Sequence, residues 1–370
     1  MGAWARHRLR DLATIVGGGT PPATDPAFFG GPVPWLTPKD LAGFRGKYIS
    51  RGARSLTLEG LRAANARILP RGSVLFTSRA PIGYLAMAAN GIATSQGFRS
   101  LVPNRGVTAE FLYYLILHKR GLIESIASGS TFREVSASVL GNVEVRVPTS
   151  IGEQEAIAGV LGSLDDQMGL LRDQMASLED LGRGAFNLRF MASGAMRRVG
   201  LGSLLDLAYG RPLPAASRTG RGYLVMGSSG PIGRHSEFLV RGPGIVVGRK
   251  GNVGTVHYCF DSFHPIDTTF YVVPRHPGSP MYFEYLLLKS LDFEDTDSAI
   301  PGLNREAALG QRVVFPGWAQ IADFNRLMGP VFAKIRHNLA RIETMGQMLG
   351  LVLPRLMEGR LALRSRPGPG

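Results

Sequence analysis

The stretch that decides the fold is residues 153–190, EQEAIAGVLGSLDDQMGLLRDQMASLEDLGRGAFNLRF. Its apolar residues recur at alternating steps of 4 and 3, and they are Ile157, Leu161, Leu164, Met168, Leu171, Met175 and Leu178. This spacing is an a/d heptad seam, which is narrower than the stripe of an ordinary amphipathic helix. Leu181, Ala185 and Leu188 extend the seam after one extra three-residue step, which predicts local overwinding. A helix of roughly 55 Å with so narrow a stripe needs a partner helix.

A second seam near the carboxyl end supplies that partner. Its members alternate at steps of 3 and 4, and they are Ile321, Phe324, Met328, Val331, Ile335, Asn338, Ile342, Met345, Leu349, Val352 and Leu356. The polar Asn338 either sits in the seam, where a lone Asn can fix register, or faces outward while Leu339 packs. Both alternatives remain open. We predict that helices within 151–192 and 317–362 pair antiparallel inside the chain.

The segments flanking the first helix share a common order of landmarks. In residues 1–150 the order is 9–13 LRDLA, 72–79 GSVLFTSR, 93–98 ATSQGF, 111–115 FLYYL and 145–148 VRVP. In residues 193–316 it is 204–208 LLDLA, 244–249 GIVVGR, 265–270 PIDTTF, 283–287 FEYLL and 313–316 VVFP. Five landmarks in one order indicate a duplicated unit.

The expected fold class is therefore α+β. Two mixed α/β domains, 1–150 and 193–316, alternate with two long helices that form an intramolecular antiparallel coiled coil of pseudo-twofold design. Within the first domain the sequence predicts helices at 58–66, capped by Thr57, and at 109–126. It predicts strands at 72–77, 84–88 and 143–147. Residues 363–370 are expected to form a disordered tail.

The charge of the chain predicts a polyanionic partner. The formal net charge is +14 and the isoelectric point is near 10.4. Residues 1–150 carry net +10, 193–316 carry +3 and 317–370 carry +5, whereas the first long helix, 151–192, carries −4. General solubility does not explain this partition. The excess positive charge lies mainly on the globular segments, as nucleic-acid binding requires.

Cysteine usage and hydropathy place the chain in a reducing cytoplasm. Cys259 is the only cysteine, so no disulfide framework or thiolate metal cluster is predicted. The longest apolar run, 111–117, is far too short to span a bilayer, and no membrane association is expected.

Catalytic motifs are not evident in the sequence. Residues 43–48, GFRGKY, only superficially resemble a phosphate-binding loop, and the seven His residues show no metal-ligand spacing. No methyl-donor loop, base-methylation motif or nuclease cluster is recognisable. We therefore predict no catalytic residue and no metal site.

Recognition chemistry is expected at loop tips that follow buried strands. Arg79 and the Arg249-Lys250 pair occupy corresponding positions, where Arg can grip guanine and Lys can hold phosphate. The alternative is a structural turn in which the Arg pairs with a nearby carboxylate. Short polar residues nearby suit base edges but can equally bond their own loops. The candidate DNA-contacting residues are Thr37, Lys39, Ser78, Arg79, Ser95, Gln96, Ser228, Ser229, Arg249, Lys250, Asn252 and Thr268.

These motifs carry a resemblance to a known family. Residues 18–21, GGTP, through 30–41, GGPVPWLTPKDL, look like the opening of a target recognition domain. Residues 131–135, TFREV, then 145–148, VRVP, and 153–158, EQEAIA, are similar to the junction into a conserved helix. Residues 226–233, MGSSGPIG, with 248–254, GRKGNVG, resemble a second variant of the domain. The family is the specificity subunits of type I restriction–modification systems. Residues 209–214, YGRPLP, depart from its glycine and tryptophan opening.

The resemblance implies a non-catalytic subunit that reads a bipartite target in double-stranded DNA. Each domain would read one half-site. The helices would set the gap and dock two modification subunits together with restriction subunits. The helix residues implied in docking and pairing are Ile157, Leu161, Leu164, Met168, Leu171, Leu178, Phe324, Met328, Val331, Ile335, Ile342 and Met345. No cofactor would be bound by this chain; S-adenosylmethionine, ATP and Mg²⁺ would belong to the partners. The alternatives are a nucleic-acid enzyme with an unrecognised active site and a DNA-binding scaffold without sequence preference.

Overall fold

The computed structural model describes residues 3–129, 133–192, 196–276, 278–293 and 302–361. The chain divides into two compact units, one made of Met1–Leu171 with Arg341–Gly370 and the other of Arg172–Ala340. Each long helix, α5 (Ile151–Phe186) and α8 (Trp318–Met357), therefore contributes to both units. The two units are described separately. The tail expected at 363–370 lies outside the described residues.

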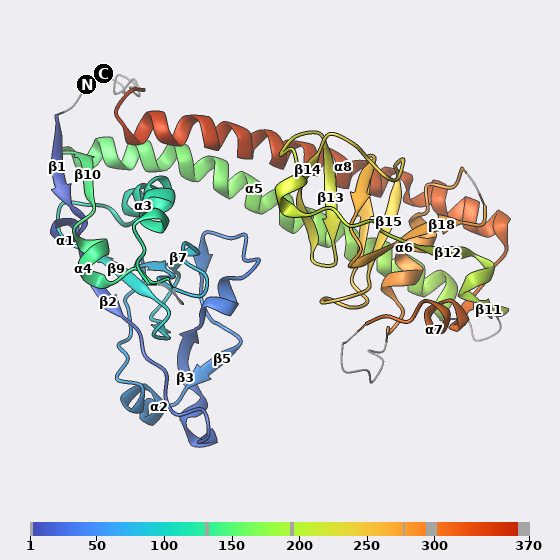
Figure 1. The fold of residues 1–370 in the computed structure, drawn as a ribbon, viewed down its shortest axis with the longest axis horizontal. Coiled ribbons are helices and arrows are strands. Elements are labelled where there is room, and N and C mark those ends of the chain that lie inside the picture. The colour runs from blue at the N-terminus through green and yellow to red at the C-terminus, as the bar shows by residue number, and fades with distance from the viewer. Residues whose placement is uncertain (1–2, 130–132, 193–195, 277, 294–301, 362–370) are drawn as a thin grey trace. The chain divides into compact units, whose positions relative to one another are not determined.

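The first unit is built on a five-stranded sheet in the order β2-β9-β6-β7-β4 (Figure 1). The strands are β2 (Ala13–Gly17), β9 (Arg99–Pro103), β6 (Val74–Phe76), β7 (Leu85–Ala88) and β4 (Tyr48–Ile49). A three-stranded sheet contains β5 (Arg54–Leu56), β3 (Phe29–Leu36) and β8 (Ala93–Thr94), and β1 (Trp4–Arg8) pairs with β10 (Glu144–Pro148). The helices are α1 (Leu9–Leu12), α2 (Leu58–Ala63), α3 (Ala109–Ser125) and α4 (Ala137–Gly141).

Helix α3 joins the sheet to the long helices in the first unit (Figure 1). Phe111, which is completely buried, shares one core with Ile157 near the start of α5 and Leu356 near the end of α8. The hydroxyl of Tyr114 on α3 donates to Asp165 Oδ2 of α5 at 2.7 Å. Apolar burial and this hydrogen bond fix the globular part of the first unit on the helix pair.

The second unit repeats this plan. A four-stranded sheet has the order β12-β18-β15-β16, a three-stranded sheet the order β14-β13-β17, and β11 pairs with β19. The strands are β11 (Arg198–Gly200), β12 (Leu205–Tyr209), β13 (Tyr223–Gly227), β14 (Gly230–His235), β15 (Gly244–Gly248), β16 (Val256–Cys259), β17 (Phe263–Pro265), β18 (Thr269–Pro274) and β19 (Arg312–Val314). The helices are α6 (Tyr282–Lys289) and α7 (Arg305–Gly310).

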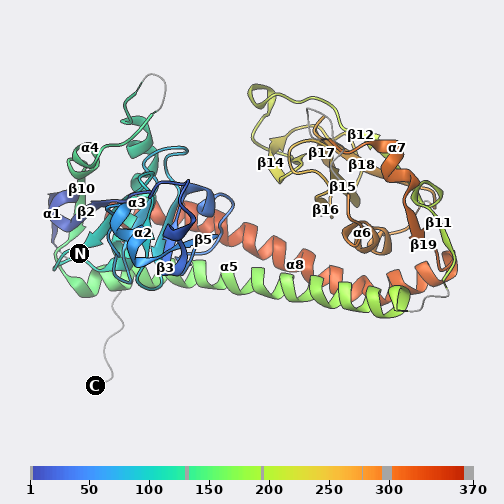
Figure 2. The same cartoon turned by 90° about the horizontal axis from the view of Figure 1, so that it is seen from below.

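Helix α6 lies beside the long helices in the second unit (Figure 2). An aromatic cluster holds it there. Phe186 and Phe190 of the first long helix meet Phe283 of α6 and Phe324 of α8, with ring centroids 5.1–6.3 Å apart. Aromatic pairs at these distances add to the stabilisation from burial. Because the end of α5 packs on the start of α8 here, and its start on the end of α8 in the first unit, the helices run antiparallel as predicted.

Two details of the predicted seam are decided by the structure. The three-residue step is wrong, because Leu181 is 58% and Leu188 is 79% exposed. Phe186 and Phe190, four residues apart, are buried instead. The helix ends there in a π-helical turn, η3 (Asn187–Met191). The aromatic side chains occupy the seam because they are larger and gain more from burial. Asn338 is completely buried and Leu339 is 41% exposed, so the Asn occupies the seam.

The remaining seam residues are buried to different depths. The buried ones are Ile157, Leu161, Met168, Leu171, Phe324, Met328 and Ile335. The half-buried ones are Leu164, Leu178, Val331, Ile342 and Met345. No helix among the described residues is both long and apolar enough to cross a membrane.

Candidate nucleic-acid interface

The loops that follow β6 and β15 have the same backbone hydrogen bonds in the two units. Ser78 N–H donates to Gly97 at 2.8 Å, and Ser78 carbonyl accepts from Val135 at 3.0 Å. Arg249 N–H donates to Thr268 at 2.9 Å, and Arg249 carbonyl accepts from Leu303 at 2.9 Å. Ser78 is therefore the counterpart of Arg249. Arg79 is the counterpart of Lys250.

The same correspondence holds one strand away, where a glycine packs against the neighbouring loop. A Cβ on Gly18 would lie 2.1 Å from the carbonyl oxygen of Thr94, and one on Gly210 would lie 2.1 Å from that of Ile266. Both contacts require glycine. The sequence departure at 209–214 therefore keeps the close approach of the opening, although the other glycines and the Trp are missing.

In the second unit the side chain of Arg249 is held in a fixed position. Its guanidinium donates to the carbonyl of Asp267 at 2.9 Å and lies 5.1 Å from the ring centroid of Tyr209. Phe270 contributes a second ring at 5.9 Å. An Arg that stacks on an aromatic ring loses little further entropy on binding, because its plane is already oriented.

Two other candidate segments meet beside this Arg. The hydroxyl of Ser228 accepts from the backbone N–H of Asn252 at 3.4 Å, which joins the turn after β13 to the loop after β15. The carbonyl of Ser228 also accepts from His257 Nε2 at 3.2 Å, when that nitrogen carries the proton. Ser229, Lys250 and Asn252 are exposed around this junction. The second unit thus gathers donors and positive charge at one loop cluster.

In the first unit Arg79 makes the carboxylate contact that was the structural alternative. Arg79 and Arg99 both approach Glu134, at 3.6 Å and 2.8 Å. Arg79 is 38% exposed through its side chain, so the pair is screened by water. Glu134 therefore orients two guanidinium groups near the loop surface without burying them.

The turn that carries Thr37 and Lys39 is held by Asp40. Its carboxylate accepts from the backbone and hydroxyl of Thr37 and from Ala53 N–H, each at 2.7 Å. Burial acts to raise the pKa of Asp40, but these hydrogen bonds outweigh burial and lower it. The turn thus holds Lys39 on the exposed side.

The candidates near β8 divide between the surface and the interior. Gln96 is exposed and accepts from the hydroxyl of Thr20, whereas Ser95 is buried, with its backbone N–H bonded to Leu36 at 2.8 Å. Ser78 is also buried, and its hydroxyl donates to Gly97 at 3.3 Å. In this state Ser78 and Ser95 shape the loops from beneath. The candidates of the second unit therefore form one exposed cluster, whereas those of the first unit are divided between the surface and the interior.

Two residues that the sequence reasoning did not select belong to these clusters. Tyr209 is 55% exposed while stacking on Arg249, and Arg99 shares Glu134 with Arg79. In the sequence, Tyr209 could have been selected because it is an aromatic residue at the end of a strand, directly before Gly210. Among the described residues, no group of three or more His, Cys, Asp or Glu side chains is placed to hold a metal ion.

Comparison with known proteins identifies the amino-terminal part of the chain. Residues 1–180 match the family described as type I restriction modification DNA specificity domain. These residues are therefore similar to a specificity domain of that family. The matched region is the first recognition domain together with most of α5, so the family's domain includes the junction from β10 into the long helix.

The relatives of the specificity domain are subunits of restriction enzymes. The specificity subunit of type I restriction enzyme MjaIX of Methanocaldococcus jannaschii is 41% identical over 190 residues, 51% of this chain and 44% of the relative. That of the HindI enzyme of Haemophilus influenzae is 25% identical over 150 residues, 40% of this chain and 32% of the relative. The matches thus span less than half of either relative.

The whole chain resembles a solved structure in fold. The crystal structure of the type I restriction-modification S subunit from M. genitalium covers 96% of both chains with a TM-score of 0.55 and 16% identity. At that identity the likeness concerns the fold alone. It extends over both recognition domains and both long helices, beyond the region that the specificity-domain family matches.

Proposed function

We propose that this chain is the specificity subunit of a type I restriction–modification system and that it reads a bipartite sequence in double-stranded DNA. The observation that carries the proposal is the match of residues 1–180 to the specificity-domain family. The backbone hydrogen bonds of Ser78 in that region recur at Arg249 in the second unit. Two similar readers on one chain suit a target with two half-sites. The positive charge of both globular segments supports DNA as the ligand.

The proposal assigns catalysis to partner subunits. The relatives are named as specificity subunits of restriction enzymes, which supports partners that methylate and cut DNA. We propose that two modification subunits, together with restriction subunits, assemble on this chain. S-adenosylmethionine, ATP and Mg²⁺ would be bound by those partners, and the complex would work in the cytoplasm.

Methylation mapping tests the proposal directly. Genomic DNA from cells with and without this gene, in the presence of the partner subunits, is expected to differ at one bipartite motif. Exchanging residues 1–150 for another such domain should change one half of that motif only. If both halves changed together, the model of two independent readers would be wrong.

Two further measurements separate this role from the alternatives. Methylation or cleavage by the purified chain alone would favour an enzyme with an unrecognised site. Salt-sensitive binding with equal affinity for all duplexes would favour a scaffold that does not read sequence.

A further inference from the structure

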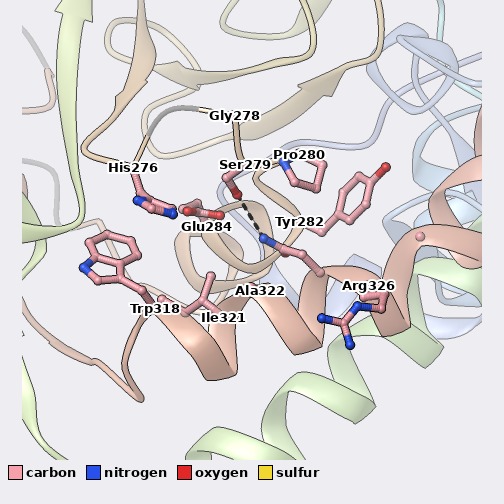
Figure 3. A pocket seen from close by; sticks show the side chains of 12 residues that line it. His276, Gly278, Ser279, Pro280, Tyr282, Glu284, Trp318, Ile321, Ala322 and Arg326 are labelled. Atoms are coloured by element: carbon pink, nitrogen blue, oxygen red, sulfur yellow. Dashed lines mark hydrogen bonds between the residues drawn. The ribbon is translucent and has the colours of Figure 1, made fainter.

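A cavity in the second unit contains a carboxyl group that the DNA-reading role does not use. The cavity lies between the segment after β18 and the first turns of α8 and has a volume of about 570 Å³ (Figure 3). That volume is in the usual range for small-molecule sites. Its lining includes Glu284 of α6, Trp318 of α8 and His276.

Glu284 is completely buried, and neither carboxyl oxygen has a hydrogen-bond partner among the described residues. Native proteins rarely leave buried polar atoms unpaired, and such cases need an explanation. The repeat sharpens the point, because the corresponding residue in the first unit is Leu112, which is equally buried. The fold therefore accepts an apolar residue at this position. The carboxyl of Glu284 is not needed for packing.

Three other polar side chains of the cavity, those of Asn325, Ser279 and Arg326, have partners. Asn325 accepts from Phe283 N–H at 2.9 Å and donates to the hydroxyl of Ser279 at 2.9 Å, a bond drawn in Figure 3. Arg326 pairs with Asp323 at 3.1 Å. The carboxyl oxygens of Glu284, by contrast, have no hydrogen-bond partner among the described residues.

A flat aromatic surface borders the same cavity. The rings of Trp318 and His276 are stacked, with centroids 5.0 Å apart and an interplanar angle of 25°. Trp318 is half-buried and His276 is exposed, so the stack reaches the mouth of the cavity. Aromatic faces attract cations, and guanidinium groups in particular stack on Trp while bonding a carboxylate with two parallel N–H groups.

We propose that this cavity binds an organic cation with a guanidinium head, which pairs with Glu284 and stacks beside Trp318. The head group could belong to a free small molecule or to an arginine side chain of a protein partner. Its N–H donors would satisfy the carboxyl oxygens that are now unpaired. The site is separate from the candidate DNA-contacting loops and does not depend on the proposed function.

Proton release should accompany binding. Burial raises the pKa of Glu284, so the empty site favours the neutral acid, and a bound cation would favour the carboxylate. The titratable and charged groups that line the cavity with Glu284 are His276 after β18, Tyr282 on α6 and Arg326 on α8, and Tyr258 on β16 also interacts with it electrostatically. Burial raises the pKa of Tyr258, so its hydroxyl stays neutral in the physiological range, and the ligand would change the ionisation of Glu284.

Calorimetric titration of the full-length chain with ethylguanidinium chloride tests the proposal, with the uncharged ethylurea as the matched control. Wild type should bind ethylguanidinium, whereas ethylurea should not bind. Glu284→Gln and Glu284→Leu should each weaken binding at least tenfold. Circular dichroism would verify their folding, and the Leu variant copies the residue that the first unit uses.

A capped arginine, N-acetyl-arginine methylamide, distinguishes the two sources of the cation. Tighter binding of the capped arginine than of ethylguanidinium supports a side chain from a partner, and equal binding supports a free small molecule. Carbon-13 NMR of the Glu284 carboxyl gives a readout without substitution, since its pKa should fall when ethylguanidinium is added. Absence of binding by both cations, unchanged binding in Glu284→Gln, or equal binding of ethylurea would overturn the proposal.

Discussion

The side chain of Asn338 on α8 donates from Nδ2 to Gln174 Oε1 on α5 at 3.3 Å, within the second unit. Asn338 is completely buried, and its Oδ1 has no partner among the described residues. One amide therefore crosses an otherwise apolar helix seam at some cost in stability. A lone Asn of this kind can specify register, because any shifted pairing would bury the amide without its partner.

Replacing this Asn should make the chain more stable but less specific in helix pairing. We expect Asn338→Leu to raise the free energy of unfolding by about 1 kcal/mol, since it removes an unsatisfied buried group. Urea denaturation measures this change. Leu339→Ala, on the exposed side of the same turn, is the control and should shift stability by less than about 0.5 kcal/mol. A loss of stability in Asn338→Leu would contradict the prediction.

The glycine shared by the two recognition domains should tolerate no side chain. In Gly210→Ala the new Cβ would lie 2.1 Å from Ile266 O, so a destabilisation of about 1–3 kcal/mol or more is expected. Gly169→Ala in α5 has no atom within 4 Å of its Cβ and should stabilise the chain by about 1 kcal/mol. Thermal unfolding of both variants checks the contrast. Equal effects would mean that the Gly210 loop rearranges freely.

Lys250 is expected to contact phosphate, because it is exposed beside the cluster and carries a flexible point charge. Lys250→Ala should weaken binding to all duplexes alike and reduce the slope of log affinity against log salt by about one. Binding isotherms at several salt concentrations provide the test. A loss confined to one target sequence would assign Lys250 to base reading instead.

Arg249 is held by Asp267 and Tyr209, and this fixed orientation favours contact with a base edge. Arg249→Ala should then cost about 1–3 kcal/mol of binding and relax preference at one base pair. Arg249→Lys is the matched variant, because it keeps the charge and removes the planar fork. If the Lys variant restored full discrimination, charge alone would explain the role of Arg249. If both variants were less stable than wild type but bound DNA with unchanged affinity and preference, the loop would be structural.

Glu284 should make stability depend on pH. Its pKa is raised above the ordinary value of 4.5 in the folded state, so the folded chain holds this proton more tightly than the unfolded chain. The stabilising contribution is present below pH about 4.5 and is lost as the pH rises through the folded pKa. Wild type should therefore lose stability relative to Glu284→Gln over that window. Parallel unfolding curves for the two proteins across pH 5 to 9 would contradict this.

The sequence alone predicted the elements that depend on local periodicity and capping. The helix at 58–66 was expected with Thr57 as its cap. The side chain of Thr57 does accept from Gly60 N–H at 3.0 Å, although the helix ends at Ala63. The heptad seams gave the antiparallel helix pair, since a narrow apolar stripe can be buried only against another helix. The order of landmarks gave the duplication. Each of these signals is contained within a few turns or strands of the chain.

The tertiary structure decided what depends on contacts between distant segments. The choice of Phe186 over Leu188 for the seam depends on Phe283 and Phe324, which lie about 100 residues or more along the chain. Glu134 pairs with Arg79 and Arg99 only because the fold brings three loops together. In the sequence Glu284 is indistinguishable from an ordinary glutamate in a helix, and only the structure shows that its carboxyl is buried and unpaired among the described residues. Burial and partnership are properties of the packed chain, so sequence periodicity determined the architecture and tertiary contacts determined the chemistry of individual side chains.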